Sequence, residues 1–312
     1  MFTVLFSVIM PENVSSIMIS IMHIVNLDLI NQFGAESLVA SSFEETEPFN
    51  EKFEEAGYES STFIIEIGPI LYLIIIYIIG ILLRAVLKKV LKANSDNWCT
   101  RFIRKPRQYR VASIRFVLEG CIEMGLAAMI SMTRMNSASF SNVAHSISSV
   151  LAFVTLLALV FAPIYMIKEI KGFLSGEGNQ LKRSQLFKGL KGDKSSLYYN
   201  VVFFARRYFM ILVLTLLPSN RNVQINCQLV SSLAMMSYVT WVRPYESKLQ
   251  NSTEIINEIT VLLSSYHLFC FTEWVYDVDR RLEIGWSLVG FIVFNVIVNV
   301  VIFLVTIFKN FR

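Results

Sequence analysis

Long apolar blocks, separated by polar or basic connections, divide the sequence into seven candidate membrane spans. Each block has about 20 residues, the length that an α-helix needs to cross a hydrocarbon core of roughly 30 Å. We place the spans at 63–83, 113–133, 147–167, 200–217, 222–242, 254–272 and 285–308. The pattern predicts an all-α fold, a polytopic transmembrane helix bundle with an acidic segment at 1–62, a seven-helix domain at 63–308 and a tail at 309–312.

The first thirty residues leave an eighth span open. MFTVLFSVIM is apolar but ends at Pro11, and it lacks the basic start and the small-residue cleavage site of a signal peptide. VSSIMISIMHIVNLDLI is apolar but interrupted by polar residues. Three interpretations compete: an uncleaved signal-like start, an eighth span and an interfacial helix. If the chain is a fragment of a longer protein, residues 1–10 are the end of a preceding span. We favour the end of a preceding span, because so short a stretch is stable in lipid only as part of a longer helix.

Composition excludes a water-soluble fold. The chain has 312 residues, of which 54% are hydrophobic and 17% are charged, whereas soluble domains have about 45–50% apolar and about 25% charged residues. The four cysteines, Cys99, Cys121, Cys227 and Cys270, have no CxxC-type spacing, and the three histidines are not paired at ligand spacing. We therefore predict no disulfide scaffold and no metal site.

Lysine and arginine residues gather on one side of the predicted membrane. The connection at 84–112 holds nine of them and the connection at 168–199 holds seven, while the whole opposite side holds five. Because basic residues accumulate on the cytoplasmic side, these two loops and the C-terminus are predicted to be cytoplasmic, facing anionic lipid headgroups. Topology accounts for most of the basic residues, so the formal charge of +4 predicts no nucleic-acid binding.

Acidic residues mark the other side. Residues 1–62 contain ten of them and a single basic residue, Lys52. We predict an integral protein of the plasma or ciliary membrane, with this segment outside. The sequon at Asn13 then lies outside and is a candidate glycosylation site, whereas the sequon at Asn251 lies in the cytoplasm. A glycan on Asn251 would overturn this topology.

Charged residues inside a span are costly, so each one is a functional hypothesis. Arg115, Glu119 and Glu123 are spaced i, i+4, i+8 and share one helix face. They either line a polar cavity or ion path, or form a salt bridge from Arg115 to Glu119 while Glu123 bonds to a neighbouring helix. We favour the second interpretation, because a pathway usually needs partners from several spans.

The sixth span carries three more such residues. Asn251 and Glu254 have the spacing of a capping box, and Glu254 and Glu258 lie near the positive end of the helix dipole. This position explains Glu254 well and Glu258 only in part. His267 lies among apolar residues, where packing is a more common role than proton transfer.

Amide and loop residues complete the candidates. Asn295 and Asn299 share one face of the last span, which favours helix association over pore lining. The loop GLKGDKSS at 189–196 lacks the spacing of a phosphate loop. No catalytic triad, HExxH pair or GxSxG elbow occurs at usable spacing, so we predict neither an enzyme nor a cofactor.

Two stretches carry a family resemblance. WVRPYESKLQNSTEIINEITVLLSSYHLFCFTEWV at 241–275 and PFNEKFEEAGYESSTFIIEIGP at 48–69 resemble the C-terminal multi-span region of very large cysteine-rich surface proteins of ciliates and other protists. The Arg-Pro-Tyr, Asn-x-x-Glu and Asn-Glu steps are distantly similar to membrane domains of transient-receptor-potential-like and polycystin-like fungal proteins. The resemblance covers 10–308 and implies seven or eight membrane helices, with no ligand or catalytic residue. The chain lacks the cysteine-rich ectodomain, which implies a partial gene product or a separate membrane subunit and argues against an adhesion role.

Two function classes are consistent with this pattern. The first is a non-enzymatic membrane protein that serves as a subunit or anchor of a larger membrane assembly, with other membrane proteins as partners. The alternative is a cation channel, with Glu119, Glu123, Glu254 and Glu258 as its polar lining and the outer acids concentrating cations. A receptor is a third class, but no pocket signature supports it.

Overall fold

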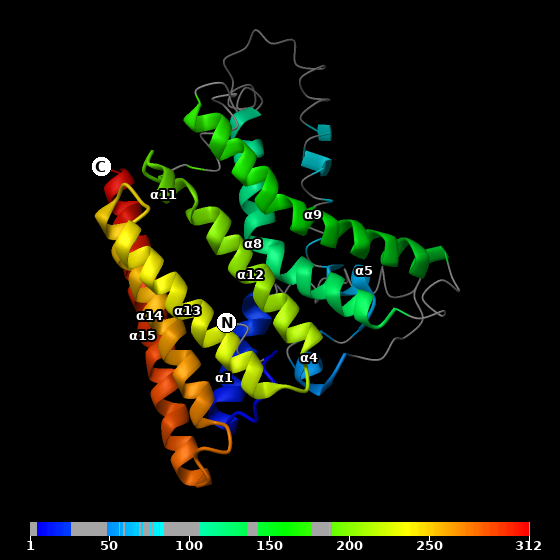
Figure 1. Cartoon of the computed structure of the whole chain (residues 1–312), viewed down its shortest axis with the longest axis vertical. Coiled ribbons are helices and arrows are strands. Elements are labelled where there is room, and N and C mark those ends of the chain that lie inside the picture. The colour runs from blue at the N-terminus through cyan, green and yellow to red at the C-terminus, as the bar shows by residue number, and fades with distance from the viewer. Residues whose placement is uncertain are drawn as a thin grey trace. The chain divides into compact units, whose positions relative to one another are not determined.

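The structure is a computed structural model of the chain, and its described residues form α-helices, loops and one isolated β-bridge (Figure 1). The all-α prediction is confirmed for these residues. They are 5–25, 49–55, 57–58, 60–68, 70, 75, 78–80, 82–83, 106–135, 143–175, 187 and 189–311. The helices are α1 (Glu12–Val25), α4 (Glu51–Glu55), α5 (Phe63–Glu66), α8 (Pro106–Thr133), α9 (Val143–Leu174), α11 (Lys194–Leu197), α12 (Tyr199–Leu216), α13 (Arg221–Val242), α14 (Lys248–Cys270) and α15 (Val278–Phe311).

The chain divides into two compact units. The first unit comprises Met1–Val25, Asn50–Gly57 and Val160–Arg312, and the second comprises Asn26–Phe49 and Tyr58–Leu159. The long helix α9 contributes its beginning to the second unit and its end to the first.

Three stretches of helix are long and apolar enough to cross a membrane. They are Val143–Leu174, Lys194–Leu216 and Val278–Phe308, and they correspond to the predicted spans at 147–167, 200–217 and 285–308. A shorter apolar helix, Gly120–Thr133, lies within the predicted span at 113–133.

The prediction of seven spans is not confirmed. The predicted spans at 222–242 and 254–272 coincide with α13 and α14, but polar residues keep both helices outside the set that qualifies by length and hydropathy. Parts of the predicted span at 63–83 lie outside the described residues, and the helix assigned within it, α5, covers only Phe63–Glu66.

The first unit is a series of antiparallel helical hairpins. Helix α12 packs against α13, α13 against α14, and α14 against α15 (Figure 1). Short connections at 217–220, 243–247 and 271–277 join them, and short connections produce antiparallel neighbours. We call the end with the second of these connections the Tyr245 end, and the end with the other two the Trp274 end.

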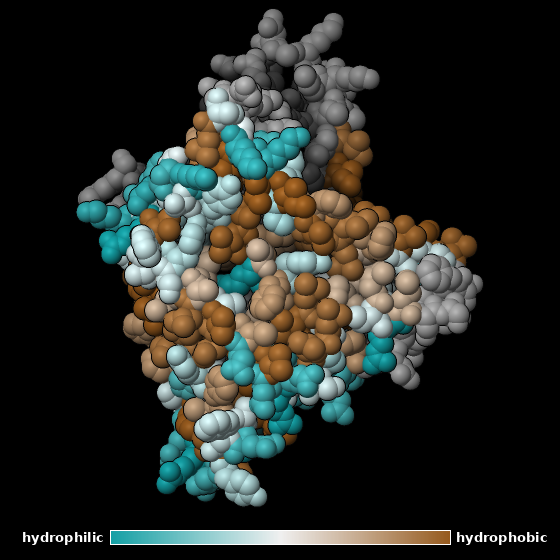
Figure 2. Space-filling view, viewed as in Figure 1, coloured by the Kyte–Doolittle hydropathy of each residue, from teal (hydrophilic) through white to brown (hydrophobic). Residues whose placement is uncertain are grey.

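Polar residues of these helices point into the bundle, and large apolar residues point out. Gln224 and Ser232 of α13 and Ser265 of α14 are fully buried. In contrast, Phe294 and Phe303 of α15 are more than half exposed, and Figure 2 shows broad apolar surface on the molecule. This distribution is expected of helices in lipid, where the outside needs only to be apolar and polar groups find partners inside.

The N-terminal segment of the first unit packs against the Trp274 end. The Ser7 N–H donates to Gln224 Oε1 at 3.0 Å, and Asn13 Nδ2 donates to the Leu282 carbonyl at 3.1 Å. A Cβ atom on Gly285 of α15 would lie only 2.7 Å from Asn13 Oδ1, so glycine permits this close approach. The described α1 has 14 residues and spans about 21 Å, which is too short to cross a bilayer.

The second unit has a small core of its own. Phe63, Ile67 and Ile70 pack against Ala127 and Ala128 of α8, together with Ala152 of α9. Small alanine side chains let helix backbones come close. A hydrogen bond of 3.2 Å from the Ile64 N–H to Ser148 Oγ joins the start of α5 to α9.

Candidate functional site

A buried ion pair joins α12 to α14. The guanidinium of Arg206 donates two hydrogen bonds to the carboxylate of Glu258, at 2.5 and 2.9 Å. The two side chains are 17% and 3% exposed. Two parallel hydrogen bonds are the strongest arrangement for this pair, and burial makes each charge dependent on the other. The helix dipole explains the position of Glu258 only in part, and the structure gives this acid a partner on another helix, Arg206.

The second acid of α14 also binds to α12. The Tyr199 hydroxyl donates to Glu254 Oε1 at 2.5 Å. The Tyr199 ring meets the Tyr245 ring edge-on, with centroids 5.4 Å apart. Tyr199 and Arg206 lie two turns apart on α12, and the two acids lie one turn apart on α14. Glu254 and Glu258, two of the four acids that the channel hypothesis places along a pore, are thus engaged in contacts between helices.

Asn251 binds to the connection at the Tyr245 end. The Asn251 Oδ1 accepts from the Tyr245 N–H at 2.9 Å, and the Asn251 Nδ2 donates to the Tyr245 carbonyl at 2.7 Å. The predicted capping box, with Asn251 as the N-cap, is wrong. The helix starts earlier than expected, with Ser247 as the N-cap. Asn251 therefore lies inside the first turns of α14, where it binds back to the preceding connection instead of capping the helix.

The loop at 189–196 is tied to the same connection. Leu190 and Tyr245 form an antiparallel β-bridge, and Gly189 provides the positive φ of 85° that this turn requires. Asp193 caps α11 by accepting from the Ser196 N–H at 3.1 Å and the Ser196 hydroxyl at 3.0 Å. Burial raises the pKa of the Asp193 carboxyl, but these hydrogen bonds and the Lys191 charge outweigh it, so the net pKa is lowered.

Amide side chains join α14 to α15 in the middle of the bundle. Asn295 Nδ2 donates to Thr260 Oγ1 at 2.7 Å and to Asn257 Oδ1 at 3.2 Å. Asn299 Nδ2 donates to Asn257 Oδ1 at 2.9 Å. We call Asn257, Thr260, Asn295 and Asn299 the amide cluster. Its members bind to each other, which is the arrangement of a helix-packing contact.

His267 lies further along the same interface. Its Nδ1 contacts the Leu263 carbonyl at 2.7 Å, and its Nε2 contacts Ser287 Oγ of α15 at 3.3 Å. Its ring meets Phe291 edge-on at 5.8 Å. Both ring nitrogens therefore have partners within the bundle.

The remaining sequence candidates lie elsewhere. Arg115 and Glu119 belong to α8, but their side chains lie outside the described residues, and Glu123 is half-buried in α8. Asn13 of α1 is half-buried, and its Nδ2 donates to the Leu282 carbonyl at 3.1 Å, so glycosylation of Asn13 stays a prediction. Within the described ranges, no group of three or more side chains is placed to hold a metal ion.

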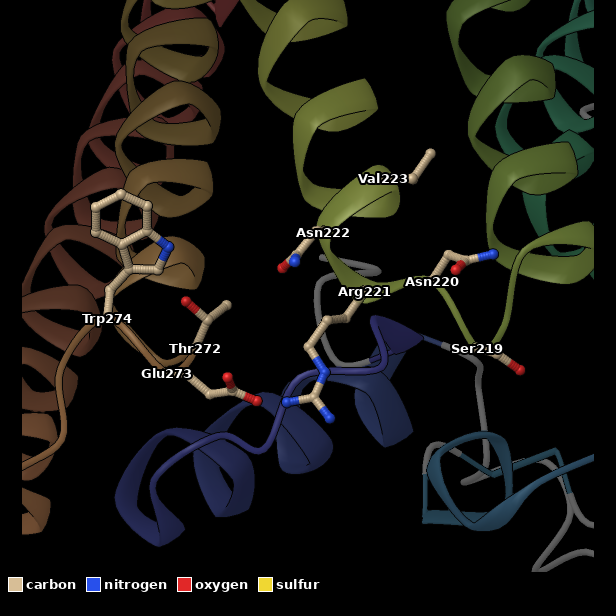
Figure 3. A pocket seen from close by; sticks show the side chains of 8 residues that line it. All are labelled: Ser219, Asn220, Arg221, Asn222, Val223, Thr272, Glu273 and Trp274. Atoms are coloured by element: carbon tan, nitrogen blue, oxygen red, sulfur yellow. The ribbon is translucent and has the colours of Figure 1, made fainter.

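A pocket of about 310 Å³ opens at the Trp274 end (Figure 3). Residues 219–223 and 272–274 line it. In the close-up, the side chain of Arg221, at the start of α13, and that of Glu273, after α14, extend toward each other, while the Trp274 ring is directed away from them. The sequence pattern does not reveal this pocket, because Arg221 and Glu273 lie just outside the predicted spans, where charges are common.

Three partners were also missed at the level of sequence: Tyr199, Arg206 and Asn257. The sequence does contain a signal for Arg206: an arginine in the third turn of an apolar helix predicts an acidic partner at the same membrane depth. Helices α12 and α14 run in the same direction, which would have directed attention to Glu258.

Comparison with known proteins gave no match among family models, curated proteins or solved structures. The geometry of the chain is therefore the basis for its proposed function.

Proposed function

We propose that the chain is a non-enzymatic, polytopic integral membrane protein with seven spans that serves as a subunit or anchor of a larger membrane assembly. The three long apolar helices support an integral membrane location. The number of spans, their orientation and the role of the protein are the parts of the proposal that go beyond a membrane location.

The hairpin geometry supports α13 and α14 as spans. Both lie between α12 and α15, which are apolar enough to cross a membrane, and each packs along its neighbours. Connections of four to seven residues cannot carry the chain back across a bilayer in extended form. Because α13 and α14 also pack alongside α12 and α15, crossing by the outer two helices would place the inner two at the same depth. Their polar residues lie inside the bundle, which explains their low hydropathy.

Charge and aromatic residues support the orientation. The Tyr245 end carries Lys191, Lys194, Arg243 and Lys248, which favours the cytoplasmic side. At the Trp274 end, the side chains of Trp274 and Tyr276 are 85% and 93% exposed. Exposed tryptophan and tyrosine are enriched at membrane interfaces. The N-terminal segment then lies outside and the C-terminus lies in the cytoplasm.

The contacts of the acidic residues in α14 are the main support for the proposed role as a subunit or anchor. Glu254 and Glu258 bind Tyr199 and Arg206, and Glu258 is almost fully buried. Acids that line a cation path must face water and release ions, whereas these two hold helices together. The exposed apolar faces of α9 and α15 provide contact surface for lipid and for other membrane subunits.

Electrical recording and native electrophoresis test this role together. We expect the purified full chain to give no ion current in planar bilayers, and we expect the protein extracted gently from its native membrane to migrate as a complex larger than the 35.7 kDa chain. A cation current that changes selectivity in Glu258→Gln, but not in the exposed control Glu246→Gln, would overturn the subunit proposal and favour the channel.

A further inference from the structure

The pocket at the Trp274 end lies between two helix ends of opposite polarity. It is bounded by the first turn of α13 on one side and by the residues that follow α14 on the other (Figure 3). A helix carries partial positive charge at its N-terminus and partial negative charge at its C-terminus. The backbone alone therefore gives this pocket a positive side and a negative side.

Arg221 strengthens the positive side. Asn220 is the N-cap of α13, but its side chain makes no capping hydrogen bond, so the first N–H groups of the helix keep their capacity to bind an anion. The half-buried Arg221 adds a full positive charge and a planar set of donors that matches a phosphate or carboxylate group.

Glu273 and Trp274 form the negative side. The Glu273 carboxylate is exposed, and the Trp274 indole is 85% exposed. Both line the pocket, and a carboxylate and an aromatic ring are each groups that attract an ammonium ion. Arg221 and Glu273 extend toward each other, yet they are not among the ion pairs of the described residues. Both charges therefore remain able to bind a ligand that carries the opposite charges.

We propose that this pocket binds a zwitterion with a phosphate group and an ammonium group, the chemistry that soluble phosphocholine shares with phosphatidylcholine and phosphatidylethanolamine headgroups. Arg221 and the first turn of α13 hold the phosphate, while Glu273 and Trp274 hold the ammonium group. The volume of about 310 Å³ lies at the small end of ligand pockets and fits a headgroup. The exposed Tyr276 close by in the chain favours lipid as the source.

Titration calorimetry with soluble probes tests the chemistry. The full chain, purified in a detergent without choline, should bind phosphocholine more tightly than choline or inorganic phosphate. Arg221→Gln should weaken phosphocholine binding about tenfold and leave choline binding unchanged, because it removes only the phosphate contact. Glu273→Gln should weaken the binding of both phosphocholine and choline.

Matched controls lie at the same end of the bundle. Arg280→Gln and Asp279→Asn remove exposed charges that do not line the pocket, so phosphocholine should bind to them as it does to wild type. Unchanged phosphocholine affinity in both Arg221→Gln and Glu273→Gln, or equal weakening in the controls, would overturn the proposal. These variants change exposed or half-exposed side chains, and an unchanged melting temperature shows that they are folded.

Mass spectrometry of lipid that stays bound during purification identifies the source. Phosphatidylcholine or phosphatidylethanolamine retained by wild type and lost in Arg221→Gln supports a lipid headgroup. Phosphocholine binding without retained lipid supports a free zwitterion. A wild-type protein that neither binds phosphocholine nor retains either lipid refutes the site. None of these outcomes depends on whether the chain is a subunit or a channel.

Discussion

Arg206 and Glu258 depend on each other at the scale of single residues. We expect Glu258→Leu to lower the free energy of unfolding by about 3–5 kcal/mol, because it leaves the Arg206 guanidinium buried without its carboxylate. The double variant Arg206→Met with Glu258→Leu should recover most of that loss, since it removes both charges. Thermal unfolding of the purified chain in one detergent measures both variants. Equal losses for the single and double variants would contradict the buried ion pair.

Gly285 permits α1 to approach α15, and Gly290 on the same helix is its control. A Cβ atom at Gly285 would lie 2.7 Å from Asn13 Oδ1 and 2.9 Å from Val14 Cγ2, whereas a Cβ atom at Gly290 meets nothing within 4 Å. We expect Gly285→Ala to destabilise the protein by about 1–3 kcal/mol and Gly290→Ala to leave it as stable or more stable. Thermal unfolding compares the two. Identical effects would show that α1 does not pack as described.

Asp193 gives the α11 cap a dependence on pH. Its lowered pKa means that the carboxylate stabilises the fold above the usual aspartate pKa, and that this contribution is lost as the pH falls through the lowered value. Asp193→Ala should cost less than about 1 kcal/mol near pH 7 because the cap is exposed, and the difference from wild type should shrink as the pH falls through the lowered pKa of the carboxyl. Melting curves recorded from neutral to acidic pH measure this. A difference that persists at the lower pH would exclude the carboxylate as its cause.

The sequence predicted which residues are unusual but not which residues they bind. Glu254, Glu258 and His267 stand out because a polar group in an apolar helix is rare and costly. Their partners could not be read directly, because Arg206 and Glu258 are 52 positions apart and meet only when two helices reach the same depth. Register between distant helices is determined by packing, which a hydropathy pattern does not contain.

At the scale of helices, the amide cluster fastens α14 to α15. Asn257 accepts hydrogen bonds from both Asn295 and Asn299. We expect Asn257→Leu to lower the stability by about 1 kcal/mol, since interhelical hydrogen bonds in membranes average about 0.6 kcal/mol each. Thr253→Val is the control, because the Thr253 hydroxyl donates to the Leu249 carbonyl of its own helix. Resistance to unfolding in SDS compares the variants, and an equal loss in both would contradict a role of the cluster in joining the helices.

Helices were predicted better than their ends. Apolar blocks identified the regions of α9, α12 and α15, because a continuous apolar run of this length has few other structures available to it. The start of α14 was placed wrongly, because Asn251 and Glu254 match a capping box while the chain turns earlier. Arg243 ends α13 with a left-handed φ of 46°, and Ser247 begins the next helix.

At the scale of the whole molecule, the number of membrane crossings is the central question. Three helices are long and apolar enough to cross a membrane, whereas the sequence pattern predicts seven spans. Hydropathy alone cannot settle α13 and α14, because residues such as Gln224 and Ser232 lower their average while they lie buried among neighbouring helices. The packing of α13 and α14 along α12 and α15 is the observation that supports the proposal that both are spans.

Cysteine accessibility in intact cells tests the crossings most directly. A chain without its four native cysteines receives one cysteine, at Ser247 of the Tyr245 end or at Asp277 of the Trp274 end, and both positions are exposed. We predict that a membrane-impermeant thiol reagent labels Asp277→Cys in intact cells and labels Ser247→Cys only after the membrane is permeabilised. Labelling of both positions from the same side would show that α14 does not cross the membrane and would contradict the proposed topology.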